Sequence, residues 1–516
     1  MIEKLRKYPY LFVEFEEAST VGSLLNLKNQ IKILTPDNQL FSMDIDSPQV
    51  KLFSKVGVVG YDLKPLCKIL KKNANVVPKA VFDTKLAKKL LHIQDTKDQL
   101  LELSKRFLSL RQLLNSKPLN IKASGVSKKI FDLINPVAAI EFNLVPNLAQ
   151  IELSGLPIDE TKTKEMLSKY AALYQKLYLD FKSRYLIDPQ SPTQLKHLFS
   201  KLGIKTGTEG SLKESSLKIY QHLEPVSHLL KLREIKKVLN KLEELNRFLK
   251  DGRVYPTFIQ IASPTGRMAA VEPNVQNLPS KLKTLVKAPQ GKTLIIADYS
   301  QIELRILAEY VKEPKMIEAF NKNLDLHRYT ASLILKKNYT EISDRERALA
   351  KAINFGLVYG MSPASLQKYV YTNYQIDVSP EEINQFYNRF FSVFSKVHQW
   401  QEEIKERLKT EGKLEVSSIL GRSNRVSRFT DAVNYPIQAT GSDLLKLAVN
   451  LFYTKKRDLK ADIVNLIHDE IVLEVDVEDV ETAKTLLREA MEEAGKYILK
   501  QVPISFDIRI SKVWEK

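Results

Sequence analysis

VNLIHDEIVLEV, residues 464–475, contains two apolar runs separated by His468, Asp469 and Glu470. Each run has the length and composition of a buried strand, so the segment predicts a hairpin whose turn contains the polar residues. Two adjacent carboxylates in so apolar a stretch are costly unless the turn brings them to water or a cation binds them. The hairpin tip is therefore the first candidate for a chemical role.

A second acidic residue ends an apolar run in KTLIIADYSQIELRILAEYV, residues 292–311. This pattern predicts a buried strand followed at once by a helix, with Asp298 where the chain surfaces. If the strand and the hairpin are neighbours in one sheet, Asp298 and Asp469 converge. Two aspartates, a backbone carbonyl and waters form an oxygen-only site suited to Mg²⁺, and two such ions can activate a hydroxyl and stabilise a leaving pyrophosphate. Considered singly, each aspartate is better explained as a helix-end or turn acid.

A third motif, SDRERALAKAINFGLVYG at residues 343–360, predicts a helix that begins with a capping box of Ser343 and Glu346. Residues spaced by four share one stripe of such a helix. Here the stripe consists of Arg347, Lys351, Phe355 and Tyr359. Two cations followed by two aromatic rings suit the phosphates, sugar and base of a nucleotide. The alternative is an ordinary surface helix with a partly buried aromatic end.

The composition agrees with a large protein that binds a polyanion. The chain has 516 residues, enough for about three or four domains. Its 79 Lys and Arg against 61 Asp and Glu give a net charge of +18, which favours nucleic acid, although a solvated basic surface without a partner is an alternative. The single cysteine, Cys67, excludes a disulfide framework and fits a reducing cytoplasm. No signal peptide or membrane span is recognisable.

The predicted secondary structure changes along the chain. Residues 1 to about 140 mix short apolar strands with helical stretches, whereas 141–255 is almost wholly helical. The seam of two long packed helices is visible in Leu232, Ile235, Leu239 and Leu242. A Gly/Ser/Thr-rich break at 203–216 predicts a loop. Strands return after residue 250, and the chain closes on the hairpin, a helix and a last strand at 504–510.

Three motifs together resemble the polymerase motifs of the family A DNA polymerases of the bacterial DNA polymerase I type. They are DYSQIELR at 298–305, RALAKAINFGLVYG at 347–360 and HDE at 468–470, in the family's order and with plausible separations. TGRMAAVEPNVQNLP at 265–279 and NYPIQATGSDLLKLA at 434–448 also match.

The resemblance covers residues 141–516 and continues more faintly through 1–140. It implies a multidomain α/β and α+β fold: a right-hand polymerase with palm, fingers and thumb, preceded by a ribonuclease-H-like exonuclease-type domain. The expected boundaries are 1–140 for a degenerate 3′–5′ exonuclease-like domain, 141–255 for the thumb, 256–310 for the first part of the palm, 311–430 for the fingers and 431–516 for the second part of the palm. The chain is expected to be large-fragment-like, without a 5′-nuclease domain.

By resemblance, Asp298, Asp469 and Lys351 are the catalytic residues, with Lys351 placed to protonate the pyrophosphate. The implied metal ligands are Asp298, the carbonyl of Tyr299, Asp469 and, in a secondary role, Glu470. The implied cofactor is a pair of Mg²⁺ ions, for which Mn²⁺ is expected to substitute.

The resemblance also implies a nucleotide site. Its residues are Arg347, Lys351, Phe355, Tyr359, His327, Gln301 and Glu303. Glu303 would exclude a ribose 2′-hydroxyl, while Ser300 and Glu303 also fit a capping box, and both explanations can hold. Phe355, in place of tyrosine, implies poor acceptance of dideoxynucleotides.

Amide and basic side chains are the expected contacts with primer and template. They are Arg267, Asn274, Gln276, Asn277, Asn434, Gln438 and His468. Minor-groove edges present acceptors at nearly the same places in every correct base pair, so donors there can test pair geometry without reading sequence. Considered singly, each amide is better explained as a turn or capping residue.

The N-terminal region departs from the family's proofreading motifs. Glu14 stands where an aspartate is expected, Glu16 is retained, the acidic position of the second motif is Leu66, and the third motif is not recognisable at 123–133. Asp83 is left without the partners that a two-metal nuclease needs. The domain is therefore expected to be a scaffold without proofreading.

The predicted activity is template-directed, DNA-dependent DNA synthesis: deoxynucleoside triphosphates are added to a primer 3′-hydroxyl with release of pyrophosphate. The expected partners are primer–template DNA and nucleotides, for a monomer in the cytoplasm with no membrane contact. Two other classes stay open. One is a non-catalytic duplex-binding relic of the same fold, and the other is a nuclease acting through Glu14, Glu16 and Asp83.

Overall fold

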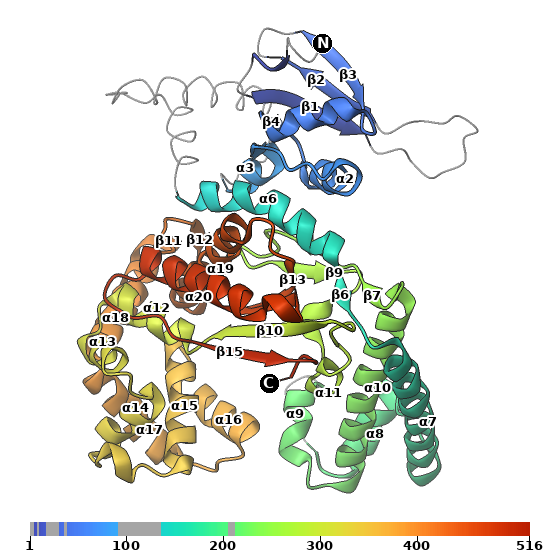
Figure 1. The fold of residues 1–516 in the computed structure, drawn as a ribbon. Helices are drawn as coiled ribbons and strands as arrows, with labels where there is room; N and C mark the ends of the chain where they lie inside the picture. Colours follow the sequence, from blue (N-terminus) through green and yellow to red (C-terminus); the bar gives the residue numbers. More distant parts are fainter. Residues whose placement is uncertain are drawn as a thin grey trace.

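The computed structural model describes residues 5–7, 10–16, 30–35, 39–90, 136–204 and 212–515. From top to bottom, Figure 1 shows a small sheet domain, the long helix α6 and a central sheet flanked by two groups of helices. No helix within these ranges is long and apolar enough to cross a membrane. The described part of the chain has the mixed α/β and α+β, multidomain character that the sequence predicts.

The N-terminal sheet has the strand order β3–β2–β1–β4–β5. The pairs β1–β2 and β2–β3 are antiparallel, whereas β1–β4 and β4–β5 are parallel. Parallel neighbours need a crossover connection, and α2 provides one between β4 and β5. The elements are β1 Tyr10–Glu16, β2 Gln30–Leu34, β3 Leu40–Asp44, η1 Pro48–Ser54, β4 Gly57–Gly60, α2 Lys64–Ala74, β5 Ala80–Asp83 and α3 Thr84–Leu90.

Helix α6, Pro136–Ser154, joins the N-terminal domain to the central sheet. Its residues in the N-terminal core are Ala138, Phe142, Val145 and Ala149. Its residues in the main core are Leu144, Leu148 and Ile151. A helix that is hydrophobic on opposite sides is stable only between two layers. The domain boundary expected at 140/141 therefore falls inside a helix that both parts share.

The central sheet has the order β13–β14–β10–β15 and is antiparallel throughout. Its strands are β10 Lys292–Tyr299, β13 Ala461–Ile467, β14 Glu470–Asp476 and β15 Phe506–Ser511. The two middle strands are buried along almost their whole length, which explains why they read as continuous apolar runs. Helices α19 (Phe429–Lys456) and α20 (Val480–Ile498) pack on each other, and α20 also packs on β10 and β14.

On one side of the sheet lies a helical group within the expected thumb (Figure 1). Its elements are α7 Glu160–Tyr185, α8 Pro192–Lys201, α9 Glu214–Leu217, η2 Lys218–Tyr220 and α10 Glu224–Phe248. Helix α10 packs along α7 and buries the four predicted seam residues, Leu232, Ile235, Leu239 and Leu242. The predicted loop at 203–216 lies largely outside the described residues.

The opposite side holds the helices expected to form the fingers (Figure 1). They are α13 Pro314–Asn321, α14 Leu326–Leu335, α15 Asp344–Val358, α16 Pro363–Tyr374, α17 Pro380–Val393 and α18 Ser395–Glu411, with the hairpin β11 Leu414–Ser417 and β12 Ser423–Val426. Helix α12, Ile302–Val311, lies at the end of the expected first palm segment and leads into them. Short elements complete the chain: β6 Leu156–Pro157, β7 Arg253–Val254, β8 Thr257–Ile259, β9 Ala269–Val271, η3 Val275–Asn277, α11 Ser280–Lys283, η4 Tyr339–Glu341 and η5 Val477–Asp479.

Candidate polymerase active site

The predicted hairpin forms, and its tip lies beside the end of β10. In the antiparallel pairing of β10 with β14, Asp298 stands opposite Glu470. The Tyr299 N–H donates to the Asp469 carbonyl oxygen over 3.3 Å. Asp298 and Asp469 are both partly exposed, in contrast to the strands that hold them. The sheet thus brings the two aspartates to the same edge, at the point where the chain reaches solvent.

Glu470 has a different environment from the two aspartates. Its side chain is buried, and Oε1 accepts a hydrogen bond from Trp514 Nε1 at 2.8 Å. Lys283 Nζ lies 3.9 Å from the same carboxylate and 4.0 Å from the centre of the Trp514 ring. Glu470 therefore ties the start of β14 to the C-terminal segment, a role that supports the placement of Asp469.

Two further residues of this edge point away from the aspartates or into solvent. The Tyr299 ring is buried, and its hydroxyl donates to the Met491 carbonyl at 3.2 Å. Only the main chain of Tyr299 lies at the edge with the aspartates. His468 is exposed at the hairpin turn and has a φ of 51°, the left-handed conformation that lets a tight turn close.

The helix predicted at 343–360 to carry nucleotide-binding residues is α15, and its capping box is present. Ser343 Oγ accepts from the Glu346 N–H at 3.2 Å, and Glu346 Oε2 accepts from the Ser343 N–H at 2.8 Å. The helix ends at Val358, so Tyr359 is its C-cap. The structure therefore confirms the helix and its start.

Basic groups occupy the first half of the predicted stripe. Arg347 donates to Asp325 Oδ2 through Nη2 at 2.6 Å and through Nε at 3.2 Å. Asp325 is the N-cap of α14, where it also accepts from the Arg328 N–H. Lys351, one turn further along α15, makes no ion pair or hydrogen bond within the described ranges. Two neighbouring cations of this kind attract anions such as phosphate, so the predicted role of Arg347 and Lys351 stays a prediction.

Aromatic rings occupy the second half. Phe355 and Tyr359 are stacked with their centroids 6.5 Å apart, and the His327 ring lies 5.7 Å from that of Phe355. Gly360 follows at a φ of +70°, and a β-carbon there would lie 2.7 Å from the Phe429 ring. Since Phe429 begins α19, this close approach sets the end of the aromatic stripe beside the first turns of α19.

His327 is buried on α14 and is a neutral imidazole at pH 7. Burial lowers its pKa from 6.5 to about 4, opposed by the charge of Asp325 and assisted by Arg347 and Lys351. Its Nδ1 lies 3.0 Å from Asn354 Nδ2, which also donates to a hydroxyl of α14. With the Asn354 amide in this orientation, Nδ1 accepts a hydrogen bond and the ring proton lies on Nε2.

One sequence prediction at this site is wrong. Ser300 and Glu303 do not form a capping box, because the N-cap of α12 is Gln301, in a left-handed conformation with a φ of 53° and without a side-chain cap. Glu303 Oε1 instead accepts from Arg267 Nη2 at 2.7 Å. Glu303, predicted to contact the sugar, and Arg267, predicted to contact DNA, thus form an ion pair with each other.

The other predicted DNA contacts divide into two groups. Asn274 caps η3 through its side chain, and Gln276 bonds the Ala270 N–H and, through Nε2, the Leu466 carbonyl at 2.7 Å. These two amides therefore shape the loop, as expected of capping residues.

The second group has no such internal use. Asn277 is exposed, and Asn434 and Gln438 lie partly exposed at i, i+4 on α19. No internal side-chain hydrogen bond is formed by these three amides in the described part of the chain. Their expected role as DNA contacts therefore stays a prediction.

Asp83, the acidic residue of the N-terminal domain, is engaged by main-chain groups. Its carboxylate accepts from the N–H groups of Asp62, Leu63, Lys85 and Leu86. Burial raises its pKa, and the backbone hydrogen bonds oppose that shift. Leu66 is fully buried. The side chains of Glu14 and Glu16 and the third motif at 123–133 lie outside what the structure describes.

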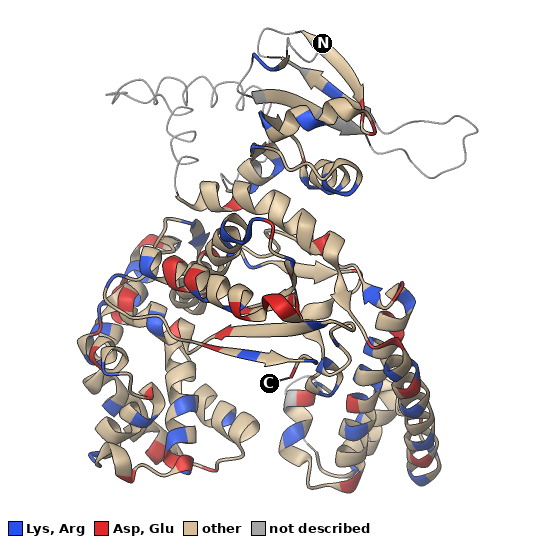
Figure 2. Cartoon of the chain, in the orientation of Figure 1, with Lys and Arg blue, Asp and Glu red and all other residues tan. Residues whose placement is uncertain are grey.

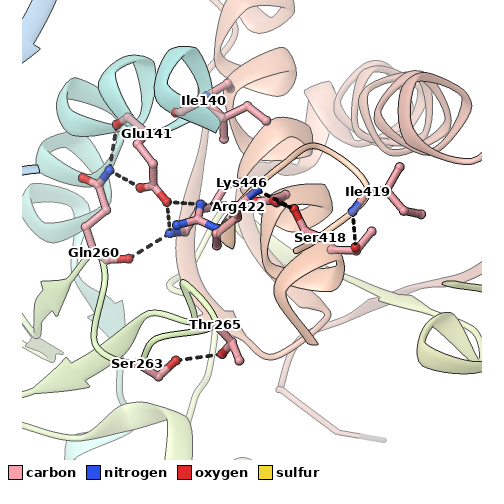
Figure 3. A network of polar contacts seen from close by, with 12 residues as sticks. Ile140, Glu141, Gln260, Ser263, Thr265, Ser418, Ile419, Arg422 and Lys446 are labelled. Atoms are coloured by element: carbon pink, nitrogen blue, oxygen red, sulfur yellow. Dashed lines mark hydrogen bonds and ion pairs between the residues drawn. The ribbon is translucent and has the colours of Figure 1, made fainter. Parts of the chain in front are cut away.

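A buried ionic network was not anticipated from the sequence. It contains Glu141, Arg422, Asp443 and Lys446, all at most 5% exposed (Figure 3). The available signal was a pair of charges, Asp443 and Lys446, three residues apart in a helix whose other buried residues are uncharged. Buried charges almost always have partners, but the sequence does not say which.

Basic side chains lie on helices at both sides of the central sheet. Figure 2 shows Lys and Arg along α7, α10 and α15, the helices on both sides of the sheet edge that holds the aspartates. Phosphate groups of a duplex and of a nucleotide are attracted to such surfaces.

An antiparallel sheet with two aspartates at one edge, between a basic helical group and a helix bearing Arg347 and Lys351, defines the right-hand class of nucleic-acid polymerases. The chain belongs to DNA polymerase family A, whose family model matches residues 156–516.

Relatives and a solved structure agree with this membership. The chain is 38% identical to DNA polymerase I of Aquifex aeolicus, over 100% of this chain and 97% of that protein. It is 31% identical to DNA polymerase I of Caldicellulosiruptor bescii and 30% identical to that of Geobacillus stearothermophilus, over 73% and 76% of this chain but only 46% and 47% of those proteins.

The fold matches the POL domain of Pol1 from M. smegmatis, solved in complex with DNA primer–template and dNTP. The TM-score is 0.77 at 24% identity, covering 94% of this chain and 93% of that chain. At this identity the match supports the fold alone.

Proposed function

We propose that this chain is a template-directed, DNA-dependent DNA polymerase that adds deoxynucleotides to a primer 3′-hydroxyl by a two-metal mechanism. The observation that supports the proposal is the pairing of β10 with β14, in which Asp298 lies opposite Glu470 and the Tyr299 N–H donates to the Asp469 carbonyl oxygen. A non-catalytic duplex-binding relic would have no need to keep two partly exposed aspartates at the edge of a buried sheet.

The donor set at this edge fits magnesium. Asp298, Asp469 and the Tyr299 carbonyl offer only oxygen atoms, and the partial exposure of both aspartates leaves room for water and phosphate oxygens. Two bound Mg²⁺ ions would activate the primer hydroxyl and stabilise the pyrophosphate as it leaves. Mn²⁺ has the same preference for oxygen ligands and is expected to substitute.

The residues of α15 and α14 would bind the triphosphate. Arg347, oriented by Asp325, and Lys351 neutralise phosphate charge, and Lys351 is the proposed proton donor to the pyrophosphate. Neutral His327 adds a hydrogen bond from Nε2. The rings of Phe355 and Tyr359 would form the wall of the site next to the sugar and the nascent base pair. Phenylalanine at position 355 is expected to disfavour dideoxynucleotides.

The sugar and the duplex are contacted from the palm. Glu303, held by Arg267 and next to Gln301 at the start of α12, is the proposed barrier to a ribose 2′-hydroxyl. Arg267, Asn277, Asn434, Gln438 and His468 are the proposed contacts with the primer terminus and the minor groove. Asn274 and Gln276, also expected as DNA contacts, would act by holding the loop in shape.

Primer extension with Mg²⁺ tests this proposal. Asp469→Asn and Asp298→Asn each remove one metal-binding charge at constant size, so we expect single-nucleotide incorporation to fall on the order of a thousandfold. Asp458→Asn, at an exposed position between α19 and β13, is the matched control and should incorporate normally. Unchanged incorporation by Asp469→Asn would remove the mechanism and leave the duplex-binding alternative.

We further propose that the N-terminal region is an exonuclease-like domain without proofreading. Its strand order and parallel β1–β4–β5 core are those expected of a ribonuclease-H-like sheet. The Asp83 carboxylate accepts four main-chain hydrogen bonds, which competes with metal binding.

A 3′-labelled single strand incubated with Mg²⁺ and no nucleotide tests the second proposal. We expect no digestion beyond that of a chain with Glu16→Ala. Digestion that this substitution abolishes would instead support the nuclease alternative through Glu14, Glu16 and Asp83.

A further inference from the structure

We propose that Arg422 is a positioning residue for sugar selection, acting through the turn at 263–266 on the Arg267–Glu303 ion pair. The inference rests on the proposed role of Glu303 as the barrier to a ribose 2′-hydroxyl. It assigns a task in nucleotide choice to a residue that is only 5% exposed.

Arg422 is held rigidly on the side away from the turn. Its Nε and Nη2 donate to Asp443 Oδ1 at 2.9 and 2.7 Å, and Nη2 also donates to Glu141 Oε1 at 2.5 Å. Its own N–H donates to Ser418 Oγ, which in turn donates to Asp443 Oδ2. A planar guanidinium bonded on two sides cannot swing without breaking buried, charge-assisted hydrogen bonds.

Lys446 completes the network and connects it to the strand that leads into the turn. Its Nζ donates to Glu141 Oε1 at 2.5 Å and to the Gln260 carbonyl at 3.0 Å (Figure 3). Gln260 Nε2 donates to the Glu141 carboxylate and to the Glu141 carbonyl. Glu141 lies on α6, so this helix anchors the first end of the turn.

The second end of the turn rests on the guanidinium itself. Gly266 has a φ of +79°, and a β-carbon built there would lie 2.6 Å from Arg422 Cζ and 2.7 Å from Nε. Only a glycine can pack so close to this group. The turn is closed by hydrogen bonds from the Gly266 N–H to the Ser263 carbonyl and from the Ala262 N–H to the Arg267 carbonyl. The face of Arg422 is therefore the support on which Gly266 sits.

The residue directly after this support is Arg267, whose Nη2 binds Glu303 Oε1 at 2.7 Å. Movement of Gly266 would move the Arg267 main chain with it. Glu303 lies in the first turn of α12 and its side chain is flexible. If the Arg267 guanidinium moves, we therefore expect the Glu303 carboxylate to move with it. Through Gly266 and Arg267, Arg422 thus determines where the Glu303 carboxylate lies relative to the nucleotide sugar.

Two substitutions perturb the support from opposite sides. Arg422→Lys keeps the positive charge between Glu141 and Asp443 but removes the planar group under Gly266. Gly266→Ala keeps Arg422 and pushes the turn away from it. Asn450→Ala is the matched control, because Asn450 joins α19 to α6 through the Ile140 carbonyl and Asn147 without touching the turn.

The measurement is kcat and KM for dCTP and CTP opposite template G, with the melting temperature of each variant. We expect both support variants to lower the ratio of kcat/KM for dCTP over CTP by roughly tenfold to a hundredfold, since small misplacements have effects of this size. The change should come from a rise in kcat/KM for CTP relative to dCTP, whatever common effect the shift of Arg267 has on both nucleotides. Asn450→Ala should lower the melting temperature while keeping the ratio.

Combination with Glu303→Ala separates the inference from its premise. If Arg422 acts through Glu303, Arg422→Lys should have no further effect on the ratio in the Glu303→Ala background. An equal effect in both backgrounds, or no effect of either support variant in the wild type, would overturn the inference. If Glu303→Ala itself leaves the ratio unchanged, the proposed role of Glu303 fails instead.

Discussion

At the scale of single residues, the proposed active site combines cations without an internal partner among the described residues and cations already paired with a carboxylate. Lys351 lacks an internal partner in the described ranges, whereas Arg347 is tied to Asp325 and Arg267 to Glu303. Committed cations have a defined place before the ligand arrives, which lowers the ordering cost of binding. In the proposed reaction, the Lys351 side chain would be able to follow a phosphate group as it moves.

His327 gives a prediction about pH. Because its pKa in the folded protein is about 4 and its ordinary value is 6.5, the unfolded chain takes up the proton first as the pH falls. The corresponding stability is present above about pH 6.5 and is lost as the pH falls towards about 4. In ¹³C-histidine NMR spectra of the free protein, the His327 signal, assigned with His327→Gln, should keep its neutral position from pH 8 to pH 5. A midpoint near 6.5 would contradict this environment.

At the scale of elements, α15 depends on its first turn. Removal of the Ser343 hydroxyl leaves the Glu346 N–H without its cap, which costs about 1 kcal/mol. We therefore expect Ser343→Ala to speed amide hydrogen exchange in the first turn of α15 and to raise KM for nucleotide modestly, because Arg347 lies in the next turn. Ser343→Asp keeps an acceptor oxygen and should restore protection. Equal exchange in Ser343→Ala and wild type would show that packing alone holds the helix.

Helices α7 and α10, which we propose form the thumb, give a second prediction at this scale. Leu239 on α10 is 4% exposed, so Leu239→Ala should destabilise this helical group by about 2–5 kcal/mol. The palm is not touched, so we expect weaker primer–template binding by fluorescence anisotropy but a nearly unchanged incorporation rate from a saturated complex. Asn240→Ala, exposed on the same helix, is the control. A lower incorporation rate in the saturated complex, without weaker primer–template binding, would contradict the proposal that α7 and α10 act in DNA binding alone.

At the scale of the whole molecule, net charge should dominate the affinity for DNA. The chain has a charge of +18, and its Lys and Arg lie on helices at both sides of the site. With about six phosphates neutralised, the logarithm of the association constant should fall with the logarithm of salt with a slope near −5. Titration of a labelled primer–template between 50 and 200 mM KCl measures it. A flat dependence would mean that contacts to phosphate are few.

The same scale shows why α6 matters beyond its length. It is buried on one side by the N-terminal domain and on the other by the central sheet and α19, and its Glu141 is the centre of the ionic network. Removal of the N-terminal domain would expose one face of this helix, so the domain has a structural task that does not depend on proofreading.

Much of the candidate site could be predicted from the sequence, because the patterns that indicate its strands and helix are local. The hairpin with Asp469, the strand ending at Asp298 and the capped helix with Arg347 and Lys351 follow from periodicity, apolar runs and a capping motif, each spanning a few residues. The resemblance to family A then assigned these segments to one site.

Packing decided the remainder, because it depends on partners far apart in the chain. Glu303 was expected to cap its own helix but pairs with Arg267, 36 residues away, and Arg422 meets Glu141 across 281 residues. A carboxylate can satisfy its hydrogen bonds locally or with a distant cation, and only the folded arrangement determines which partner is within reach. The sequence therefore determined which chemical groups the site contains, and the tertiary structure determined which of them are already bound to each other.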